Sequence, residues 1–271
     1  MRITSLIDDW EGTNLTAEHG LSLWIENADG QVGLFDMGQS ALFARHAKQL
    51  GKDLSSVRWA VISHGHYDHG GGLKTFLEHN TTAPVYVQDR AFESHFSQHS
   101  DGLHAIGLDA TLQAHPQIRI CHGDCSIPLP DSTYTLQLVT GTCTTGRPTD
   151  NQRLLGQDGK TPDNFCHEQS LIIVDKVTSQ TYLFAGCAHG GILNIIHKAT
   201  SVLGQAPTYV IGGMHLNHIT RADAKQLARQ LQATRCQFIT MHCTGYKAYE
   251  QLKEIMGTQI SYLSCGETIE L

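Results

Sequence analysis

The stretch that decides the fold is Val57-Arg-Trp-Ala-Val-Ile62, followed directly by Ser63-His-Gly-His-Tyr-Asp-His69. A short, mostly apolar run of this kind predicts a buried β-strand. The residues after it place four nitrogen or oxygen donors within six positions, namely His64, His66, Asp68 and His69. Because the strand end fixes the backbone and the neighbouring glycines permit tight turns, this segment can direct all four side chains into one pocket.

Imidazole rings and a carboxylate at this spacing suit a divalent metal ion. Zn²⁺ is the first expectation, and Fe or Mn are alternatives. The other interpretation is a histidine-rich turn without a role, which the density of donors and their position after a strand disfavour. A site for two metals needs more ligands than this turn supplies, so the others have to come from elsewhere in the chain.

Three more histidines each follow a predicted strand of the C-terminal half. His189 lies in Phe184-Ala-Gly-Cys-Ala-His-Gly-Gly191, His215 in Ile211-Gly-Gly-Met-His-Leu216, and His242 in Thr240-Met-His-Cys-Thr-Gly245. In α/β proteins, ligands and chemistry gather where the chain emerges from strand ends. One such histidine would be typical of a structural role, whereas three alike predict that they converge with the first cluster.

Hydrophobic periodicity predicts alternating strands and helices in both halves of the chain. In the N-terminal third we expect strands at 21–25, 31–36 and 57–62, and helices at 40–50 and 73–78. After residue 169 we expect strands at 170–175, 181–186, 208–212, 236–241 and 260–264, and helices at 191–203, 222–233 and after Tyr246. An offset of 149 residues places Leu34 on Leu183 and His66 on His215. Two similar halves predict two packed sheets with helices outside them and a cleft where strand ends converge.

The segment at about 89–168 is less regular and rich in Gly, Pro, Asp and Thr. A long irregular segment inside a compact enzyme is more often a lid or specificity element than a linker. We therefore expect one domain over residues 1–271, with this insert covering the site. Plain surface decoration is the alternative. The polar residues of this insert that could contact a substrate are Arg147, Lys160 and Asn164. Ordinary loop roles are the alternative for each of them.

The composition limits where the protein acts and on what. With 271 residues, 40% hydrophobic and 17% charged, the chain suits a folded protein with a core rather than a disordered one. The net charge of −7, from 19 Lys+Arg and 26 Asp+Glu, weighs against a nucleic-acid partner. No stretch approaches the roughly 18 uninterrupted apolar residues of a membrane span. Eight cysteines without a Cys-x-x-Cys pair, and an acidic start without a signal peptide, lead us to expect a reduced cytoplasmic protein.

Most of the remaining histidines are expected to have plain surface roles. They stand in polar or helical contexts and belong to no motif. These are His46, His79, His95, His99, His104, His115 and His197.

These motifs resemble the metallo-β-lactamase superfamily. The run His64-x-His66-x-Asp68-His69 is similar to the most specific motif of that family, and Leu34-Phe-Asp-Met-Gly38 usually accompanies it. The stretches 34–40, 63–71, 186–194, 212–216 and 242–245 are similar to one branch. That branch includes the archaeal-type dihydropterin ribofuranosyl-aminobenzene phosphate synthases and many uncharacterised bacterial hydrolases. The resemblance covers nearly the whole chain and implies an α/β fold, an αββα sandwich of two mixed β-sheets with helices on both outer faces.

The resemblance also implies a binuclear metal site. It assigns His64 and His66 to one metal, and Asp68 and His69 to the second, with His242 as the last histidine ligand. The two divalent ions would be Zn²⁺, with Fe or Mn as alternatives.

The chain departs from the family at the residue that usually bridges the metals. Where the family has Asp, Cys187 follows Gly186 here, so we assign His189 as the third ligand of the first metal. Cys187, His167 and Glu168 are the candidates for the missing bridge. A small buried thiol is the alternative for Cys187, since free cysteines are commonly buried.

Two further residues have roles implied by position. His215 is not a usual ligand, and it suits a proton donor to the leaving group, a contact to substrate phosphate or a supporting group. Asp36 is expected to orient a ligand histidine or the motif loop. Two metals about 3.5–4 Å apart would lower the pKa of a bound water towards neutral, and the resulting hydroxide would attack carbon or phosphorus. Asp68 can orient this nucleophile as well as bind metal, and His215 can donate a proton to the leaving group. Asp68 and His215 are therefore the candidate catalytic residues.

These expectations leave several functions open. The first is a metal-dependent hydrolase that uses a metal-bound hydroxide on a phosphorylated or pterin-like small molecule. The second is a pterin-transfer synthase in which an arylamine displaces diphosphate. The third is a ligand-binding or sensory member of the fold without turnover, which the intact ligand set disfavours. The fourth is a nuclease acting on RNA, which the acidic charge disfavours.

Overall fold

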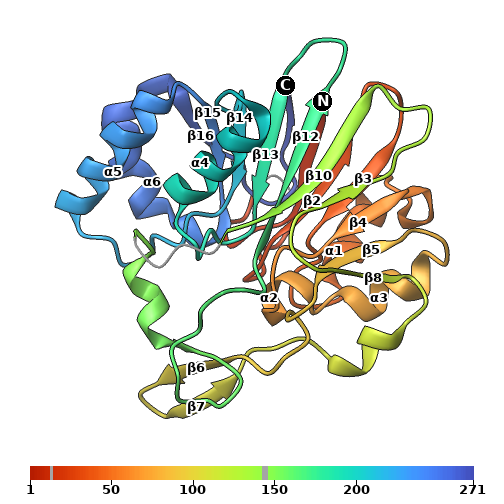
Figure 1. Cartoon of the computed structure of the whole chain (residues 1–271), viewed down its shortest axis with the longest axis horizontal. Coiled ribbons are helices and arrows are strands. Elements are labelled where there is room, and N and C mark those ends of the chain that lie inside the picture. Colours follow the sequence, from red (N-terminus) through yellow and green to blue (C-terminus); the bar gives the residue numbers. More distant parts are fainter. Residues whose placement is uncertain (13–14, 142–145) are drawn as a thin grey trace. The chain divides into compact units, whose positions relative to one another are not determined.

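The structure of the chain, a computed structural model, describes residues 1–12, 15–141 and 146–271 (Figure 1). The expected insert at 89–168 therefore includes four residues, 142–145, that lie outside the described residues. The chain divides into two compact units, each with its own seven-stranded sheet. The first unit comprises Met1–His122, Arg153–Asp163 and Leu263–Leu271, and the second comprises Gly123–Gln152 and Asn164–Tyr262. The single domain expected over 1–271 stays a prediction.

The first unit contains a mixed sheet in the order β17-β1-β2-β3-β4-β5-β8. Neighbours from β17 to β3 are antiparallel, and neighbours from β3 to β8 are parallel. The strands are β1 (Arg2–Ile7), β2 (Ser22–Glu26), β3 (Val32–Phe35), β4 (Trp59–Val61), β5 (Val85–Gln88), β8 (Ile118–Cys121) and β17 (Thr268–Glu270). A separate small sheet joins β6 (Phe96–His99), β7 (Gly102–Ala105) and β11 (Leu154–Leu155).

The helices of the first unit are α1 (Leu42–Gln49), α2 (Tyr67–Gly70) and α3 (Leu73–His79). Phe43 of α1 and Phe76 of α3 are fully buried and belong to one apolar cluster with Leu34, Ile62 and Val85 of the sheet region. Burial of such side chains stabilises a fold by about 1.5–3 kcal/mol each. This core fixes the end of β4, where the histidine-rich turn begins.

The second unit repeats this plan with the sheet order β16-β15-β14-β13-β12-β10-β9. Neighbours from β9 to β13 are antiparallel, and neighbours from β13 to β16 are parallel. The strands are β9 (Cys125–Ile127), β10 (Tyr134–Thr140), β12 (Gln169–Asp175), β13 (Thr181–Ala185), β14 (Tyr209–Gly212), β15 (Gln237–Thr240) and β16 (Ile260–Tyr262). Its helices are α4 (Ile192–Leu203), α5 (Arg221–Thr234) and α6 (Tyr246–Met256), drawn in teal to blue beside β14–β16 in Figure 1.

Each helix of the second unit places an apolar stripe in one core. Ile195 and Ile196 of α4, Leu231 of α5 and Leu252 of α6 are buried together with Phe238 of β15. The two sheets therefore share the same strand pattern, antiparallel on one side and parallel on the other. The predicted α/β class, with two mixed sheets and helices, is confirmed.

The segment at 89–168 is more regular than its composition indicated. Strand β8 extends the first sheet, and β9 and β10 extend the second. The β10 pairing with β12 runs over seven residues, from Tyr134 opposite Asp175 to Thr140 opposite Gln169. The alternation of buried and exposed residues along β10 is itself a strand signal, whereas β8 and β9 are short strands at the edges of their sheets. Among the described residues, none of the helices has the length and apolar character that a membrane span requires.

The end of β14 is closely packed at Gly212, its last residue, and a substitution there tests this packing. Its φ is +132°, and a Cβ there would lie 1.8 Å from the Ala185 carbonyl oxygen on β13. We expect Gly212→Ala to lower the free energy of unfolding by about 3 kcal/mol, because it combines backbone strain with overpacking. In Gly204→Ala, where φ is +72° but a Cβ meets open space, the loss should be only about 1 kcal/mol. Urea unfolding of both variants distinguishes them, and equal losses would contradict the packing argument.

Candidate metal centre

In the first unit, the four donors of the histidine-rich turn are brought together by β4 and α2. The turn follows β4 directly, and Asp68 and His69 lie in the short helix α2. His64 and His69 are fully buried, and His66 and Asp68 are only 5% and 7% exposed. Buried polar groups at this density are costly unless each one has a partner. The contacts of the turn show how that cost is met.

Asp36 is the anchor of this turn. It follows β3 with a φ of +60°, and its side chain is fully buried. Its carboxylate accepts hydrogen bonds from the Ser63 backbone N–H (2.7 Å), from Ser63 Oγ (2.7 Å) and from His69 Nδ1 (2.7 Å). Because His69 donates through Nδ1, its Nε2 carries the lone pair that a metal requires. This is the orienting contact expected for Asp36.

His64 is held in the same way. Its Nδ1 lies 2.9 Å from Ser63 Oγ, whose proton is already donated to Asp36, so His64 donates to Ser63 and keeps a lone pair on Nε2. That Nε2 lies 3.0 Å from His66 Nδ1. The ring centroids of His64 lie 4.4 Å from those of His66 and 4.1 Å from those of His69. The turn therefore brings its three imidazoles together, with His64 Nε2 facing His66 Nδ1.

Two histidines outside the predicted ligand set lie near this turn. His19 Nε2 lies 3.4 Å from Asp68 Oδ2, and its Nδ1 lies 2.9 Å from Asp9 Oδ2. His95 is 3% exposed and pairs with buried Asp163 at 2.9 Å, and its ring packs so closely on the turn that a Cβ at Gly65 would lie 2.8 Å from its Nε2.

The surface role expected for His95 is therefore wrong, and so is that for His46. His46 is 3% exposed, and its Nδ1 contacts the Leu6 backbone oxygen at 2.8 Å. His46 lies on the buried face of α1 with Phe43 and Ala47. The burial of His95 results from residues far away along the chain, such as Asp163.

In the second unit, the parallel strands β13, β14 and β15 end at one edge of the sheet. The residues that follow them include Ala188, His215 and His242, whose φ values are +57°, +51° and +50°. Residues other than glycine rarely adopt such angles, and where they do so together they mark functional sites. The strain is located at the three strand ends that the sequence indicated.

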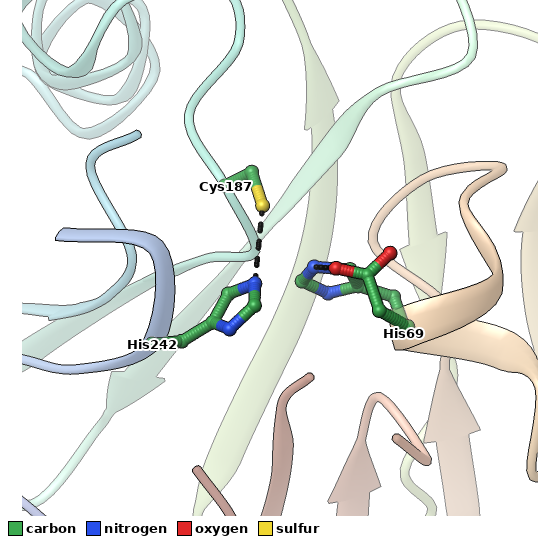
Figure 2. Close-up of side chains that lie close together, drawn as sticks. His69, Cys187 and His242 are labelled. Atoms are coloured by element: carbon green, nitrogen blue, oxygen red, sulfur yellow. Dashed lines mark hydrogen bonds and ion pairs between the residues drawn. The ribbon is translucent and has the colours of Figure 1, made fainter. Parts of the chain in front are cut away.

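Cys187 and His242 contact each other at this edge. Cys187 Sγ lies 3.5 Å from His242 Nε2, as Figure 2 shows, and the two residues are 3% and 1% exposed. The Cys243 thiol donates to the Cys187 carbonyl oxygen at 3.7 Å, and the His215 backbone N–H donates to Cys243 Sγ at 3.2 Å. One donor atom from each of Cys187, His215 and Cys243 lies within 4.8 Å of the other two.

His189 is oriented by three neighbours. Its Nδ1 lies 2.8 Å from Asn151 Oδ1, and Asn151 Nδ2 donates to the His189 carbonyl oxygen at 2.8 Å, which fixes the amide orientation. His189 therefore donates from Nδ1 and keeps a lone pair on Nε2. Phe165 stacks on its ring at 4.4 Å with an angle of 9°, and the His215 ring lies 4.4 Å from it on a tilt.

Glu168 holds the loop that carries His189. One of its carboxylate oxygens accepts from the His189 N–H and the other from the Gly190 N–H, both at 2.7 Å. Burial raises the pKa of Glu168 to about 7, although these two backbone donors act in the opposite direction. Glu168 is therefore a positioning group for the loop. Of the three candidates for the missing bridge, Cys187 contacts His242 within the second unit.

The polar candidates of the 89–168 segment fall in both units. Arg147 donates to the Asn164 carbonyl oxygen at 2.8 Å, and its guanidinium lies over the Phe165 ring at 5.6 Å. Lys160 belongs to the first unit and is exposed. Arg147 and Asn164 thus act on the stack beside His189.

The six predicted ligands form two donor sets. His64, His66, Asp68 and His69 belong to the first unit, and His189 and His242 belong to the second. The donor chemistry fits divalent metals, because the rings of His64, His69 and His189 each have Nδ1 engaged by an oxygen that leaves Nε2 as the ligand atom.

Several known proteins are similar to this chain. The family model described as the metallo-beta-lactamase superfamily matches residues 15–151. A 7,8-dihydropterin-6-methyl-4-(beta-D-ribofuranosyl)-aminobenzene-5'-phosphate synthase of Methanocaldococcus jannaschii is 25% identical, covering 100% of this chain and 96% of the relative. An uncharacterised protein of the same organism is 24% identical, over 93% and 94% of the two chains.

Solved structures show the same fold. Tm1679, described as a metal-dependent hydrolase of the beta-lactamase superfamily, has a TM-score of 0.80 and 24% identity, covering 100% of this chain and 99% of that one. The short form of human tRNase Z has a TM-score of 0.58 and 12% identity, covering 100% and 99%. Both likenesses concern the arrangement of the strands and helices.

Proposed function

The chain belongs to the metallo-β-lactamase superfamily, and on this basis we propose that it is a metal-dependent hydrolase of a phosphorylated or pterin-like small molecule. The observation that carries the proposal is the orientation of the buried histidines, whose Nδ1 atoms are held by Asp36, Ser63 and Asn151. An imidazole fixed in this way serves as a metal ligand. The substrate class rests on the synthase relative, which is similar over the whole chain.

We propose that the two donor sets supply one binuclear centre. His64, His66 and His189 would hold the first divalent ion, and Asp68, His69 and His242 the second. Cys187 would take the place of the family's bridging aspartate, which its 3.5 Å contact with His242 supports. When bound, the ions would make water nucleophilic at neutral pH and stabilise negative charge on the reacting group.

The protein's own residues would then position the reactants. The second carboxylate oxygen of Asp68 can accept a hydrogen from the attacking water and so orient it. His215 is the proposed proton donor to the leaving group. It is only partly buried, and its Nδ1 has no hydrogen-bond partner among the described residues. Because that nitrogen is itself buried, the exposed part of the ring would have to exchange the proton with a substrate.

A pterin-transfer synthase is the second candidate, because the named relative is a synthase. In that reaction an arylamine would displace diphosphate from a pterin. The same ligands and the same proton donor would serve both reactions, so substrate assays have to distinguish the synthase from the hydrolase.

We also propose that the protein acts in the cytoplasm. No disulfide joins the seven cysteines within the described ranges, which agrees with a reducing, cytoplasmic setting.

The test combines metal analysis of the purified protein with a panel of phosphodiester, thioester and lactone substrates. We expect close to two equivalents of zinc, iron or manganese, and metal-dependent turnover of the phosphodiester. Product formation only when a pterin diphosphate and an arylamine are both present would assign the synthase instead. Full metal occupancy without turnover on either assay would overturn both and favour a binding protein.

A further inference from the structure

The second unit contains a cavity of about 260 Å³ beside its strand ends. One wall is the start of α4 with Gly191 and Ile192, and another is Met214 with His215 after β14. The third wall is α5, which contributes Asp223, Gln226, Leu227 and Gln230. Gln226, Leu227 and Gln230 stand three, four and seven positions after Asp223, so the four side chains line one face of the helix.

The cavity is adjacent to residues of the proposed site. His215 lines it, and the His215 ring lies 4.4 Å from the His189 ring. Gly191 also lines it and follows the Gly190 amide that Glu168 holds. A molecule in the cavity would therefore have one end at the proposed proton donor.

The lining is mainly apolar and almost balanced in charge. Its walls include Ile192, Leu193, Leu216, Ile219 and Leu227. Such apolar walls suit a flat ring, because binding removes both faces of the ring from water.

The ionised side chains of the lining are one cation and one anion, Arg147 and Asp223. Arg147 already donates to the Asn164 carbonyl oxygen and covers the Phe165 ring. A phosphate group is bound best by a surplus of positive charge, which this lining does not supply, so the cavity disfavours it.

The polar groups of the α5 face suit the edge of a nitrogen heterocycle. The Gln226 and Gln230 side chains are exposed amides that both donate and accept hydrogen bonds. Asp223 uses one carboxylate oxygen to accept from Thr220 Oγ1, which leaves the other to accept from a ring N–H or an exocyclic amine.

We propose that this cavity binds the flat, uncharged nitrogen-heterocyclic part of the substrate, with the bond to be cleaved beside His215. This inference rests on the proposed function and names the part of the substrate that the second unit binds. A volume of about 260 Å³ lies just below the ~300–1,000 Å³ of pockets that hold whole drug-sized ligands, so it suits a fused ring rather than a complete ring–sugar–phosphate molecule.

The test is a fluorescence titration of pterin with the metal-loaded protein. We expect Leu227→Trp, which fills the cavity, to weaken pterin binding by ~10-fold or more, the size of effect that small changes in an apolar pocket have. Arg229→Trp is the matched control, since Arg229 is exposed on the same helix and does not line the cavity. Inorganic phosphate should not compete with pterin. If circular dichroism shows that Leu227→Trp is misfolded, Gln230→Trp at an exposed position replaces it.

Two outcomes separate this inference from the proposed function. If pterin binds the wild type, Leu227→Trp loses it and no substrate is turned over, the cavity assignment stands and the enzyme assignment fails. If a pterin-containing substrate is turned over and KM is unchanged in Leu227→Trp, the cavity assignment is overturned. Competition by inorganic phosphate would overturn it as well.

Discussion

Replacing His64 with alanine should lower kcat/KM by more than ~10³-fold, because both the reactivity of water and the stabilisation of developing charge depend on the metals. His64 is fully buried, and its ring lies within 4.4 Å of both other histidines of the turn. Metal analysis should show the loss of about one equivalent of the bound ion. Circular dichroism should show a folded protein, since the apolar core of the first unit is unchanged.

His79→Ala is the matched control for this prediction. His79 is exposed at the end of α3 in the same unit, and its Nδ1 contacts the Thr75 carbonyl oxygen of its own helix. Its removal should leave activity and metal content unchanged. Turnover in His64→Ala within ten-fold of the wild type would contradict the assignment of His64 as a ligand.

Asp36→Ala should weaken both metal binding and the fold. The variant leaves the Ser63 N–H, the Ser63 hydroxyl and His69 Nδ1 without their common acceptor. An unsatisfied buried donor costs ~1–3 kcal/mol, so a loss of about 3 kcal/mol in the free energy of unfolding is expected. Loss of a group that orients a ligand should lower zinc affinity by ~10–100-fold.

Urea unfolding and zinc titration of the same variant check both parts of this expectation. Asp36→Asn, which keeps one acceptor oxygen and tolerates a positive φ, should lose less on both measures. Exposed Asp53, which caps a 3₁₀ turn, is the control position, and Asp53→Ala should not change zinc affinity. An unchanged zinc affinity in Asp36→Ala would contradict the orienting role.

The central strands and helices could be predicted because their periodicity is local. Helix α4, expected at 191–203, is Ile192–Leu203, and β13, expected at 181–186, is Thr181–Ala185. Strands β1 and β17 could not, because they are paired with each other from opposite ends of the chain. Nothing in a window around either one signals that pairing.

The proposed donor residues carry local sequence signals, whereas the residues that orient them do not. His189 stands after a strand in a glycine-rich run, which is a local signal. Asn151, which orients its ring, is 38 residues away in sequence, and Glu168, which holds its loop, is 21 residues away. Such contacts result from tertiary packing, so the sequence left three candidates for the bridging role. We propose Cys187 for that role, and Glu168 instead holds the loop through the His189 and Gly190 amides.

We propose that donors of both units bind the same metal ions. A double-mutant cycle of zinc affinity between His64 and His189 tests it most directly. If both histidines hold one ion, each alanine variant loses that ion, and the double variant binds zinc no more weakly than the weaker single variant. If His189→Ala binds zinc as the wild type does, or if the two losses simply multiply, the two residues do not share an ion and the account is contradicted.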